Sequence, residues 1–262
     1  YLRRNFKSEQ DEAFNELPFA REVAERFETD HHELIVRPDA VELLPRIVRH
    51  FGEPFADSSA IPLYYLSRFA REHVKVVLSG EGGDEIFAGY QTYIASKLAH
   101  WYRQLPRRVA RSMVPGLVNR LPVSHRRASF DYKAKRFVRG AALPPLERHH
   151  AWKEIFSPDV RTELTGRRSG YDPVDLLRAR FEETEGAELL TRLQDVDLGT
   201  YLVDDLLVKT DRASMAHSLE ARVPYLDPVV AGLAQALPTS LKVRGFRKKV
   251  LLRKAAAPLL PR

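Results

Sequence analysis

The stretch Lys75–Tyr90 reads Lys-Val-Val-Leu-Ser-Gly-Glu-Gly-Gly-Asp-Glu-Ile-Phe-Ala-Gly-Tyr, and it decides the fold. The β-branched run from Val74 to Leu78 predicts a short strand. A polar loop, Ser79 to Asp84, follows at once, and a helical pattern begins after it. The sequence therefore predicts a strand–loop–helix unit with a glycine-rich bend.

The bend combines glycines with acids. Three of the four residues from 80 to 83 are glycine, which permits left-handed backbone and close approach of a ligand. The amides at the start of the following helix suit an anion, yet Glu81, Asp84 and Glu85 would repel a bare phosphate. A phosphate that arrives with a divalent cation fits both features. The simpler alternative is a tight turn whose acids cap the helix.

Three common motifs do not match this loop. It lacks the Gly-x-x-x-x-Gly-Lys-Ser/Thr pattern of a Walker loop. Glu85 stands where a dinucleotide-binding fingerprint needs its third small residue. Ser79 lacks the Gly-x-Ser-x-Gly frame of a hydrolase nucleophile.

Composition limits the class of protein. The chain has 262 residues, 44% of them hydrophobic, which is enough for a large packed domain. It contains no cysteine, so it has no disulfide, thiolate nucleophile or cysteine-bound zinc. No apolar run approaches the roughly 20 residues of a membrane span. We expect a soluble, cytoplasmic protein.

The positive charge is concentrated in one segment. The net charge is +7, and the residues from 103 to 139 contain eleven Lys or Arg but one acid, Asp131. A polyanion partner is one interpretation. However, the segment has few interleaved aromatic residues, so a solvated basic face is favoured and nucleic-acid binding is disfavoured.

The first part of the chain alternates helical and strand patterns. Apolar residues between Pro18 and Phe27 predict a helix, and residues 33–36 predict a strand. Residues 40–51 predict a second helix, and Pro62 starts a third. This alternation indicates an α/β unit with a parallel sheet, in which ligands bind beyond the carboxyl ends of the strands. The Ser79–Asp84 loop lies at such an end.

Strand signals fade after about residue 103. We divide the chain into a partial α/β core at 1–102, a basic helical and loop segment at 103–170, and a helical part of the same domain at 171–262. In the last part, oppositely charged residues stand among apolar ones and predict a partly buried ion network. These residues are Asp205, Lys209, Arg212, Glu220 and Arg222.

Two further stretches could face a ligand. The polar loop at 52–62 contains Asp57, Ser58 and Ser59, which can cap the next helix or contact a substrate. The stretch at 245–254 is a cationic turn that opens a helix. One of its basic residues could reach phosphates at the central loop, or the whole turn could be an exposed basic face.

Two motifs carry a resemblance to a known family. They are Ser79–Tyr90 and the pair Asp211–Met215 and Leu219–Asp227, which reads Asp-Arg-Ala-Ser-Met and Leu-Glu-Ala-Arg-Val-Pro-Tyr-Leu-Asp. Together they resemble the synthetase domain of glutamine-hydrolysing asparagine synthetases, with a weaker match between 100 and 170. The resemblance implies an α/β fold of the ATP-pyrophosphatase type (adenine nucleotide alpha hydrolase-like, Rossmann-like), a parallel sheet with a largely helical C-terminal part.

The resemblance also implies a reaction. Aspartate attacks the α-phosphate of ATP, with Mg²⁺, to form β-aspartyl-AMP and pyrophosphate. Ammonia released from glutamine then displaces AMP in asparagine biosynthesis. The chain would thus belong to an ATP-dependent, AMP-forming carbon–nitrogen ligase.

Site roles follow by position within the resemblance. Glu81 would be the general base for ammonia, and Lys249 would stabilise the pentavalent phosphorus and the departing pyrophosphate. Asp84 would bind pyrophosphate through magnesium. The nucleotide-binding residues would be Ser79, Gly80, Gly82, Gly83, Asp84 and Lys249.

The sequence departs from the family in what it lacks. It shows neither the amino-terminal glutaminase domain with its cysteine nucleophile nor the Ser-Gly-Gly-x-Asp-Ser pyrophosphate loop. We therefore expect a fragment that cannot use glutamine, is inactive alone and needs a glutaminase domain as partner. A homodimer is left open.

Two other functions remain open. One is a related amidotransferase that adenylates another carboxylate, as in envelope biosynthesis, β-lactam formation or peptide cyclisation. The other is a polyanion-binding or assembly module with a vestigial site.

Overall fold

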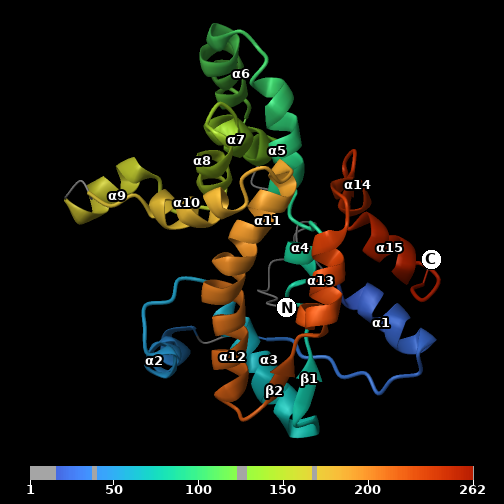
Figure 1. Cartoon of the computed structure of the whole chain (residues 1–262). Coiled ribbons are helices and arrows are strands. Elements are labelled where there is room, and N and C mark those ends of the chain that lie inside the picture. Colours follow the sequence, from blue (N-terminus) through green and yellow to red (C-terminus); the bar gives the residue numbers. More distant parts are fainter. Residues whose placement is uncertain (1–15, 37–39, 123–128, 167–169, 262) are drawn as a thin grey trace. The chain divides into compact units, whose positions relative to one another are not determined.

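The computed structural model describes residues 16–36, 40–122, 129–166 and 170–261 (Figure 1). These residues form two compact units whose segments alternate along the chain. The first unit takes its residues from 1–83, 201–234 and 251–262, and the second takes its residues from 84–200 and 235–250. The chain therefore leaves the first unit within the predicted site loop, between Gly83 and Asp84.

The first unit contains helices around one small sheet. Its elements are α1 Leu17–Arg26, α2 Ala40–Phe51, α3 Ala60–His73, β1 Val76–Leu78, the π-helical η3 Leu202–Leu207, α12 Val208–Met215, β2 Glu220–Arg222 and the 3-10 turn η4 Pro224–Leu226. Most of α13 (Pro228–Ala236) and of α15 (Val250–Ala256) also belong to it. Figure 1 shows β1 and β2 side by side, with α3 and α12 next to them.

The parallel sheet is smaller than predicted. Val76, Val77 and Leu78 pair with residues 220–222 in parallel register, and this is the one parallel pairing in the described part of the chain. Strand β1 is also mostly exposed, with Leu78 at 73%. The α/β class is confirmed, but the expected larger parallel sheet among residues 1–102 is not seen in the ranges described.

The strand predicted at 33–36 does not form. Residues 31–35 have no regular structure, and Val36 makes only an isolated bridge. The carboxylate of Glu33 instead accepts two hydrogen bonds from Arg21 of α1, each 2.7 Å long. This segment is thus held to a helix and does not extend along a strand.

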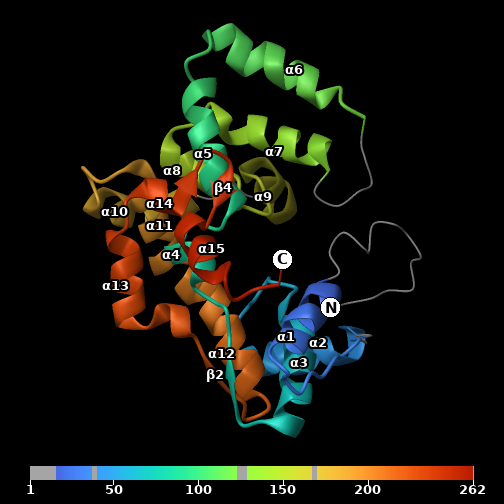
Figure 2. The same ribbon diagram turned by 90° about the vertical axis from the view of Figure 1, so that its right-hand side faces the viewer.

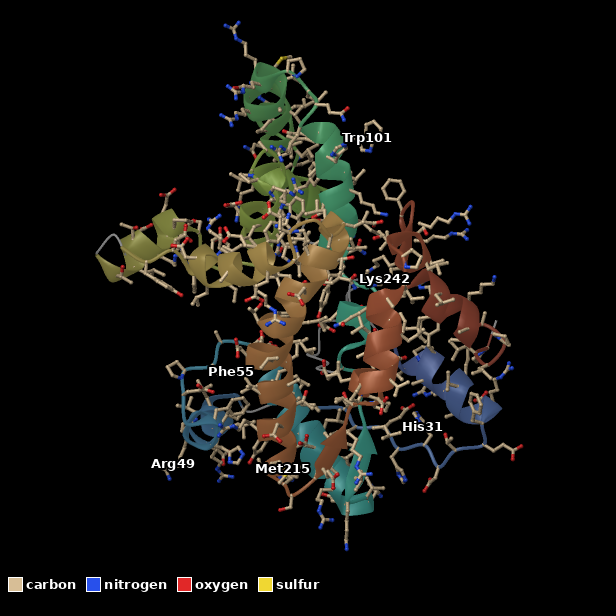
Figure 3. The ribbon with its side chains drawn as sticks, viewed as in Figure 1. His31, Arg49, Phe55, Trp101, Met215 and Lys242 are labelled. Carbon is tan, nitrogen blue, oxygen red and sulfur yellow. The ribbon has the colours of Figure 1, made fainter. Side chains whose placement is uncertain are left out.

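The helices predicted at 18–27 and 40–51 are confirmed, as α1 and α2. The third helix, α3, begins at Ala60, two residues before Pro62. Leu43, Ile47 and Phe51 of α2 bury their side chains against Ala60 of α3. Phe55 packs onto this cluster from the intervening loop (Figure 3).

The second unit is almost entirely helical (Figure 2). Its elements are α4 Gly83–Ile86, α5 Gln91–Tyr102, the π-helical η2 Val109–Met113, α6 Val114–Asn119, α7 Phe130–Ala141, α8 Pro145–Ala151, α9 Pro158–Thr165, α10 Pro173–Glu183, α11 Leu189–Gly199, α14 Thr239–Lys242, β3 Val243–Arg244 and β4 Arg247–Lys248. Strands β3 and β4 form an antiparallel hairpin. No helix in the described residues is long and apolar enough to cross a membrane.

Two of the apolar clusters of this unit include residues of α5. Tyr93 and Ile94 of α5 pack with Leu193 of α11 and Val243 of β3. Tyr102, the last residue of α5, packs with Ala110 of η2, Ala141 of α7 and Trp152, which directly follows α8. Helix α5 therefore contributes to both clusters, and it is connected to the predicted site loop through α4.

Candidate active site

The predicted loop continues the β1–β2 pairing and then turns sharply. The N–H of Ser79 donates to the carbonyl of Arg222 at 2.8 Å, one step beyond the strand. The Ser79 hydroxyl then accepts the N–H of Glu81 at 3.3 Å, and the N–H of Gly83 donates to the carbonyl of Gly80 at 3.4 Å. The loop is thus a compact turn that ends in the four-residue helix α4.

Two glycines of the loop pack against the turn η4. Gly82 has φ +83°, and a Cβ there would overlap with the side chain of Leu226. A Cβ on Gly83 would lie 3.1 Å from the ring of Tyr225. Gly80, by contrast, has open space around it. The stretch Leu219–Asp227 therefore supplies the surface that shapes the loop.

Glu81 lies against α12. Its Oε1 accepts a hydrogen bond from Oγ1 of Thr210 at 3.3 Å. Thr210 is buried, whereas Glu81 is partly exposed. A buried hydroxyl thus orients a carboxylate that solvent can still reach, which is the arrangement a proton acceptor needs.

A buried lysine lies one residue before Thr210. Nζ of Lys209 is 2.6 Å from Oδ2 of Asp57, whose two oxygens also accept the N–H and the hydroxyl of Ser59 at 2.8 Å. Burial by itself raises the pKa of Asp57, but the hydrogen bonds from Lys209 and Ser59 outweigh it and lower that pKa. Asp57 therefore orders the turn before α3 and at the same time neutralises Lys209. The side-chain cap that one reading of the sequence predicts does not form, because the N-cap residue Ser59 makes no capping hydrogen bond.

Asp205 completes the charged group in this unit. It lies in the π-helical segment η3, and its buried Oδ1 accepts no hydrogen bond from the described residues. Burial, followed by the charge of Asp57, raises the pKa of Asp205 above its usual value. π-Helical segments are frequent at functional sites because they redirect side chains within a helix.

The predicted ion network is therefore only partly correct. Lys209 and Asp205 are in it, together with Asp57 from a distant loop. Arg212 is exposed, and Glu220 forms an exposed pair with Arg222 at 2.7 Å. The sequence pattern did not distinguish the buried charged residues from the exposed ones, since both kinds stand among apolar residues.

The second unit holds Asp84 and Lys249. Nζ of Lys249 lies 2.9 Å from Oδ1 of Asp84. The lysine follows strand β4 directly and precedes α15, whereas Asp84 is the second residue of α4. The Asp84 side chain remains 45% exposed and that of Lys249 26%. The structure thus pairs Lys249, from the basic turn at 245–254, with the predicted loop acid Asp84.

Backbone geometry around this pair is specialised. A Cβ on Gly89 would overlap with Oδ1 of Asp84 and with Cε of Lys249, so the pair occupies space that only glycine leaves open. The N–H of Gly89 also donates to the carbonyl of Asp84 at 2.7 Å. Lys249 itself has φ +51°, in the left-handed region that lysine seldom adopts. Gly89 was not assigned a role from the sequence, although its position five residues after Asp84 can be read directly from it.

A buried polar network lies behind α4 in the same unit. Asp197 of α11 accepts hydrogen bonds from Tyr93 at 2.6 Å and from His149 at 2.8 Å, and it pairs with Lys153. Lys153 in turn lies over the ring of Tyr90. No spacing in the sequence signals this network, because its members come from three separate helices and their flanks.

Nearly the whole sequence is similar to one group of known proteins. Residues 4–262 match the family model described as asparagine synthase. A putative glutamine-hydrolysing asparagine synthetase of Mycobacterium bovis is 38% identical over 253 residues, covering 95% of this chain and 37% of that protein. Asparagine synthetase 1 of Bacillus subtilis is 32% identical over 257 residues, covering 96% and 39%.

An archaeal protein extends the range of relatives. Putative asparagine synthetase 2 of Methanocaldococcus jannaschii is 32% identical over 208 residues, covering 77% of this chain and 38% of that protein. In each of these three alignments the chain spans under two fifths of the relative's length.

Proposed function

This chain belongs to the asparagine synthase family, and we propose that it performs the ATP-dependent amidation of aspartate in asparagine biosynthesis. In the first half-reaction, the side-chain carboxylate of aspartate attacks the α-phosphate of ATP and displaces pyrophosphate. In the second, ammonia attacks the acyl carbon of β-aspartyl-AMP, loses a proton and displaces AMP. Glutamine is the proposed source of ammonia, since the relatives are named as glutamine-hydrolysing.

The contact between Asp84 and Lys249 carries this proposal. An ammonium group is held at 2.9 Å by a carboxylate, and both side chains are still partly exposed. Phosphoryl-type transfer depends on positioning and on neutralising charge on the leaving phosphates. Lys249 would neutralise pyrophosphate as it departs, and Asp84 keeps the lysine in place before nucleotide binds.

Asp84 also fits a magnesium ion. Magnesium is commonly bound by one or two carboxylates together with substrate phosphates. Asp84 stands in the first turn of α4, and its side chain is 45% exposed, so the carboxylate can take part in such a set. The ion would add positive charge near the β- and γ-phosphates. Ser79, Gly80, Gly82 and Gly83 would contact the adenylate, since the glycines of their loop leave little side-chain bulk in the way of a ligand.

Glu81 is the proposed proton acceptor of the amidation half-reaction. Thr210 holds its Oε1 at 3.3 Å, so the carboxylate has a fixed orientation. Ammonia that attacks the acyl carbon becomes a cationic adduct, and loss of its proton commits the intermediate to amide formation. Glu81 is not needed for the attack on phosphorus, so the two half-reactions use different residues.

The two half-reactions can be measured separately in the complete product of the reading frame. Aspartate-dependent exchange of pyrophosphate into ATP reports adenylation, and asparagine formed from ammonium chloride reports amidation. We expect Lys249→Ala to lower both rates at least a hundredfold, because exchange requires the stabilised leaving group. Glu81→Gln should keep exchange and lose amidation. Arg253→Ala, an exposed basic residue of α15, is the matched control.

Three results would contradict the proposal. Exchange with another carboxylic acid but none with aspartate would support the related amidotransferase. Equal loss of both half-reactions in Glu81→Gln would remove the division of roles. Full exchange activity in Lys249→Ala would remove the role of the ion pair.

A further inference from the structure

Helix α4 is too short to hold its own position. It has four residues, Gly83–Ile86, so nearly all of its carbonyls lack partners within the helix. Isolated helices of this length are unstable in water. The position of Asp84, which lies in α4, must therefore come from contacts with other elements.

Gln194 of α11 supplies such a contact. Its Nε2 donates to the carbonyl of Glu85 and, at 3.1 Å, to the carbonyl of Ile86, the last two residues of α4. The side chain of Gln194 is buried, with 3% of the residue exposed. Both hydrogens of the amide are thus used on adjacent carbonyls at the end of one short helix.

The opposite end of the same amide faces Lys242. Nζ of Lys242 lies 3.2 Å from Oε1 of Gln194. Carbonyls only accept hydrogen bonds and an ammonium group only donates, so these partners fix which way the amide points. Lys242 is 2% exposed and closes α14 (Figure 3).

Lys242 is connected to Lys249 through the β3–β4 hairpin. Val243 pairs with Lys248 across the hairpin, and Lys242 and Lys249 are the residues that flank this pair. The base of the hairpin is itself fixed, because Nζ of Lys97 donates to the carbonyl of Val243 at 3.0 Å. A contact that holds Lys242 therefore also limits where Lys249 can be.

We propose that Gln194 is a positioning residue for the proposed reaction, because one amide side chain sets α4 and the hairpin base in fixed relation and so brings Asp84 and Lys249 together. The contacts form a closed path: Asp84 to the end of α4, to Gln194, to Lys242, across the hairpin base to Lys249, and back to Asp84 at 2.9 Å. This inference rests on the proposed function only for its effect on rate. The structural part stands on the contacts alone.

The test compares two residues of α11. Gln194→Leu removes the contacts on both sides at nearly equal volume. Gln194→Glu keeps an acceptor for Lys242 but places a carboxylate against two carbonyls, so it separates the two contacts. Arg192→Leu is the matched control, because the guanidinium of Arg192 also donates to a carbonyl, but to that of Phe181 in α10, at 2.7 Å.

Two readouts are needed. In the aspartate-dependent exchange assay, we expect both Gln194 variants to lower kcat roughly tenfold to a hundredfold, as misplacement of a reacting group by about 1 Å does. KM for aspartate should change less than about twofold, and Arg192→Leu should leave kcat near that of the wild type. The second readout is amide hydrogen exchange of residues 84–90, which we expect to accelerate in the Gln194 variants and to stay unchanged in Arg192→Leu.

The two readouts distinguish failure of this inference from failure of the proposed function. Unchanged hydrogen exchange at 84–90 in Gln194→Leu would overturn the inference, whatever the activity. Equal loss of kcat in Gln194→Leu and Arg192→Leu would also overturn it, since general loss of stability would then explain both. If the wild-type protein shows no pyrophosphate exchange with any carboxylic acid, the proposed function is contradicted. Amide hydrogen exchange then still decides whether Gln194 fixes α4.

Discussion

Nζ of Lys209 and Oδ2 of Asp57 lie 2.6 Å apart, so an ion pair joins α12 to the turn that precedes α3. The ammonium side chain is 9% exposed and the carboxylate 25%. We predict that Lys209→Met lowers the free energy of unfolding by about 3 kcal/mol, because it leaves a partly buried carboxylate without its counter-ion. Urea unfolding measures this difference.

A matched control comes from the surface of the same unit. Arg222 and Glu220 are similarly close, at 2.7 Å, but both are more than half exposed, so Arg222→Met should lower the free energy of unfolding by less than about 1 kcal/mol. The double variant Asp57→Asn/Lys209→Met should lose less than the sum of the single variants. Strict additivity would show that the two side chains have no coupling energy.

Asp197 makes the second unit sensitive to acid. Burial by itself raises the pKa of Asp197, but the charge and hydrogen bond of His149 and those of Lys153 outweigh it and lower that pKa to about 2. A depressed carboxyl pKa stabilises the fold above the unfolded-state value near 4, and this stability is lost as the pH falls from about 4 to 2. The shift corresponds to about 2 kcal/mol.

Substitution of Asp197 tests this origin of the acid sensitivity. We predict that Asp197→Asn unfolds more easily than the wild type at pH 7, and that this difference shrinks as the pH falls toward 2. Urea unfolding of both proteins from pH 7 to pH 2.5 measures it. A difference that stays constant over this range would assign the acid sensitivity to other groups.

Substitution of Gly89 tests whether the Asp84–Lys249 pair depends on the absence of a side chain at position 89. A methyl group at Gly89 overlaps with both side chains, so Gly89→Ala must displace one or both of them. We predict a loss of pyrophosphate exchange of about a hundredfold, measured alongside circular dichroism. Gly116 of α6 has open space where a methyl group would lie, so Gly116→Ala is the control and should keep full activity. An active Gly89→Ala protein would show that this close packing is dispensable.

Gly82 tests the fit between the site loop and η4. Gly82→Ala forces alanine into φ +83° and against Leu226, so we predict a loss of about 3 kcal/mol in the free energy of unfolding. Adding Leu226→Ala to Gly82→Ala should recover the stability lost through the overlap, but not the stability lost through the strained backbone. Gly80→Ala, at an open position, should change stability by less than about 1 kcal/mol. If Leu226→Ala recovers nothing, the overlap is not the cause.

Local signals in the sequence were sufficient for the strand–loop–helix unit. The β-branched run predicted β1, and the glycines predicted the turn, because both effects act within a few residues of the chain. The strand predicted at 33–36 was wrong, because the carboxylate of Glu33 is held by Arg21 of α1 and no local pattern records that contact. Residues Arg126 and Arg127 of the basic segment lie outside the described residues, so its proposed polyanion role stays a prediction.

Residues of the candidate site could be predicted only where the resemblance to the asparagine synthetase family identified matching positions. It named Asp84 and Lys249, which the structure brings to 2.9 Å, although they come from distant parts of the sequence. Gln194 and Thr210 could not be found from their spacing, because each acts through one hydrogen-bonding side chain on a residue far away along the chain. Nothing in a local pattern marks a glutamine that binds two carbonyls.

At Lys249 the backbone conformation favours one residue type and the charge next to Asp84 requires another. At the junction of β4 and α15, φ +51° is a conformation that glycine adopts freely and that is unfavourable for lysine by about 1 kcal/mol. A chain selected for folding alone would place glycine there and lose the ammonium group next to Asp84. The junction is therefore a point at which improving the fold removes the charge, and stabilising substitutions found by screening for heat resistance should be checked here first.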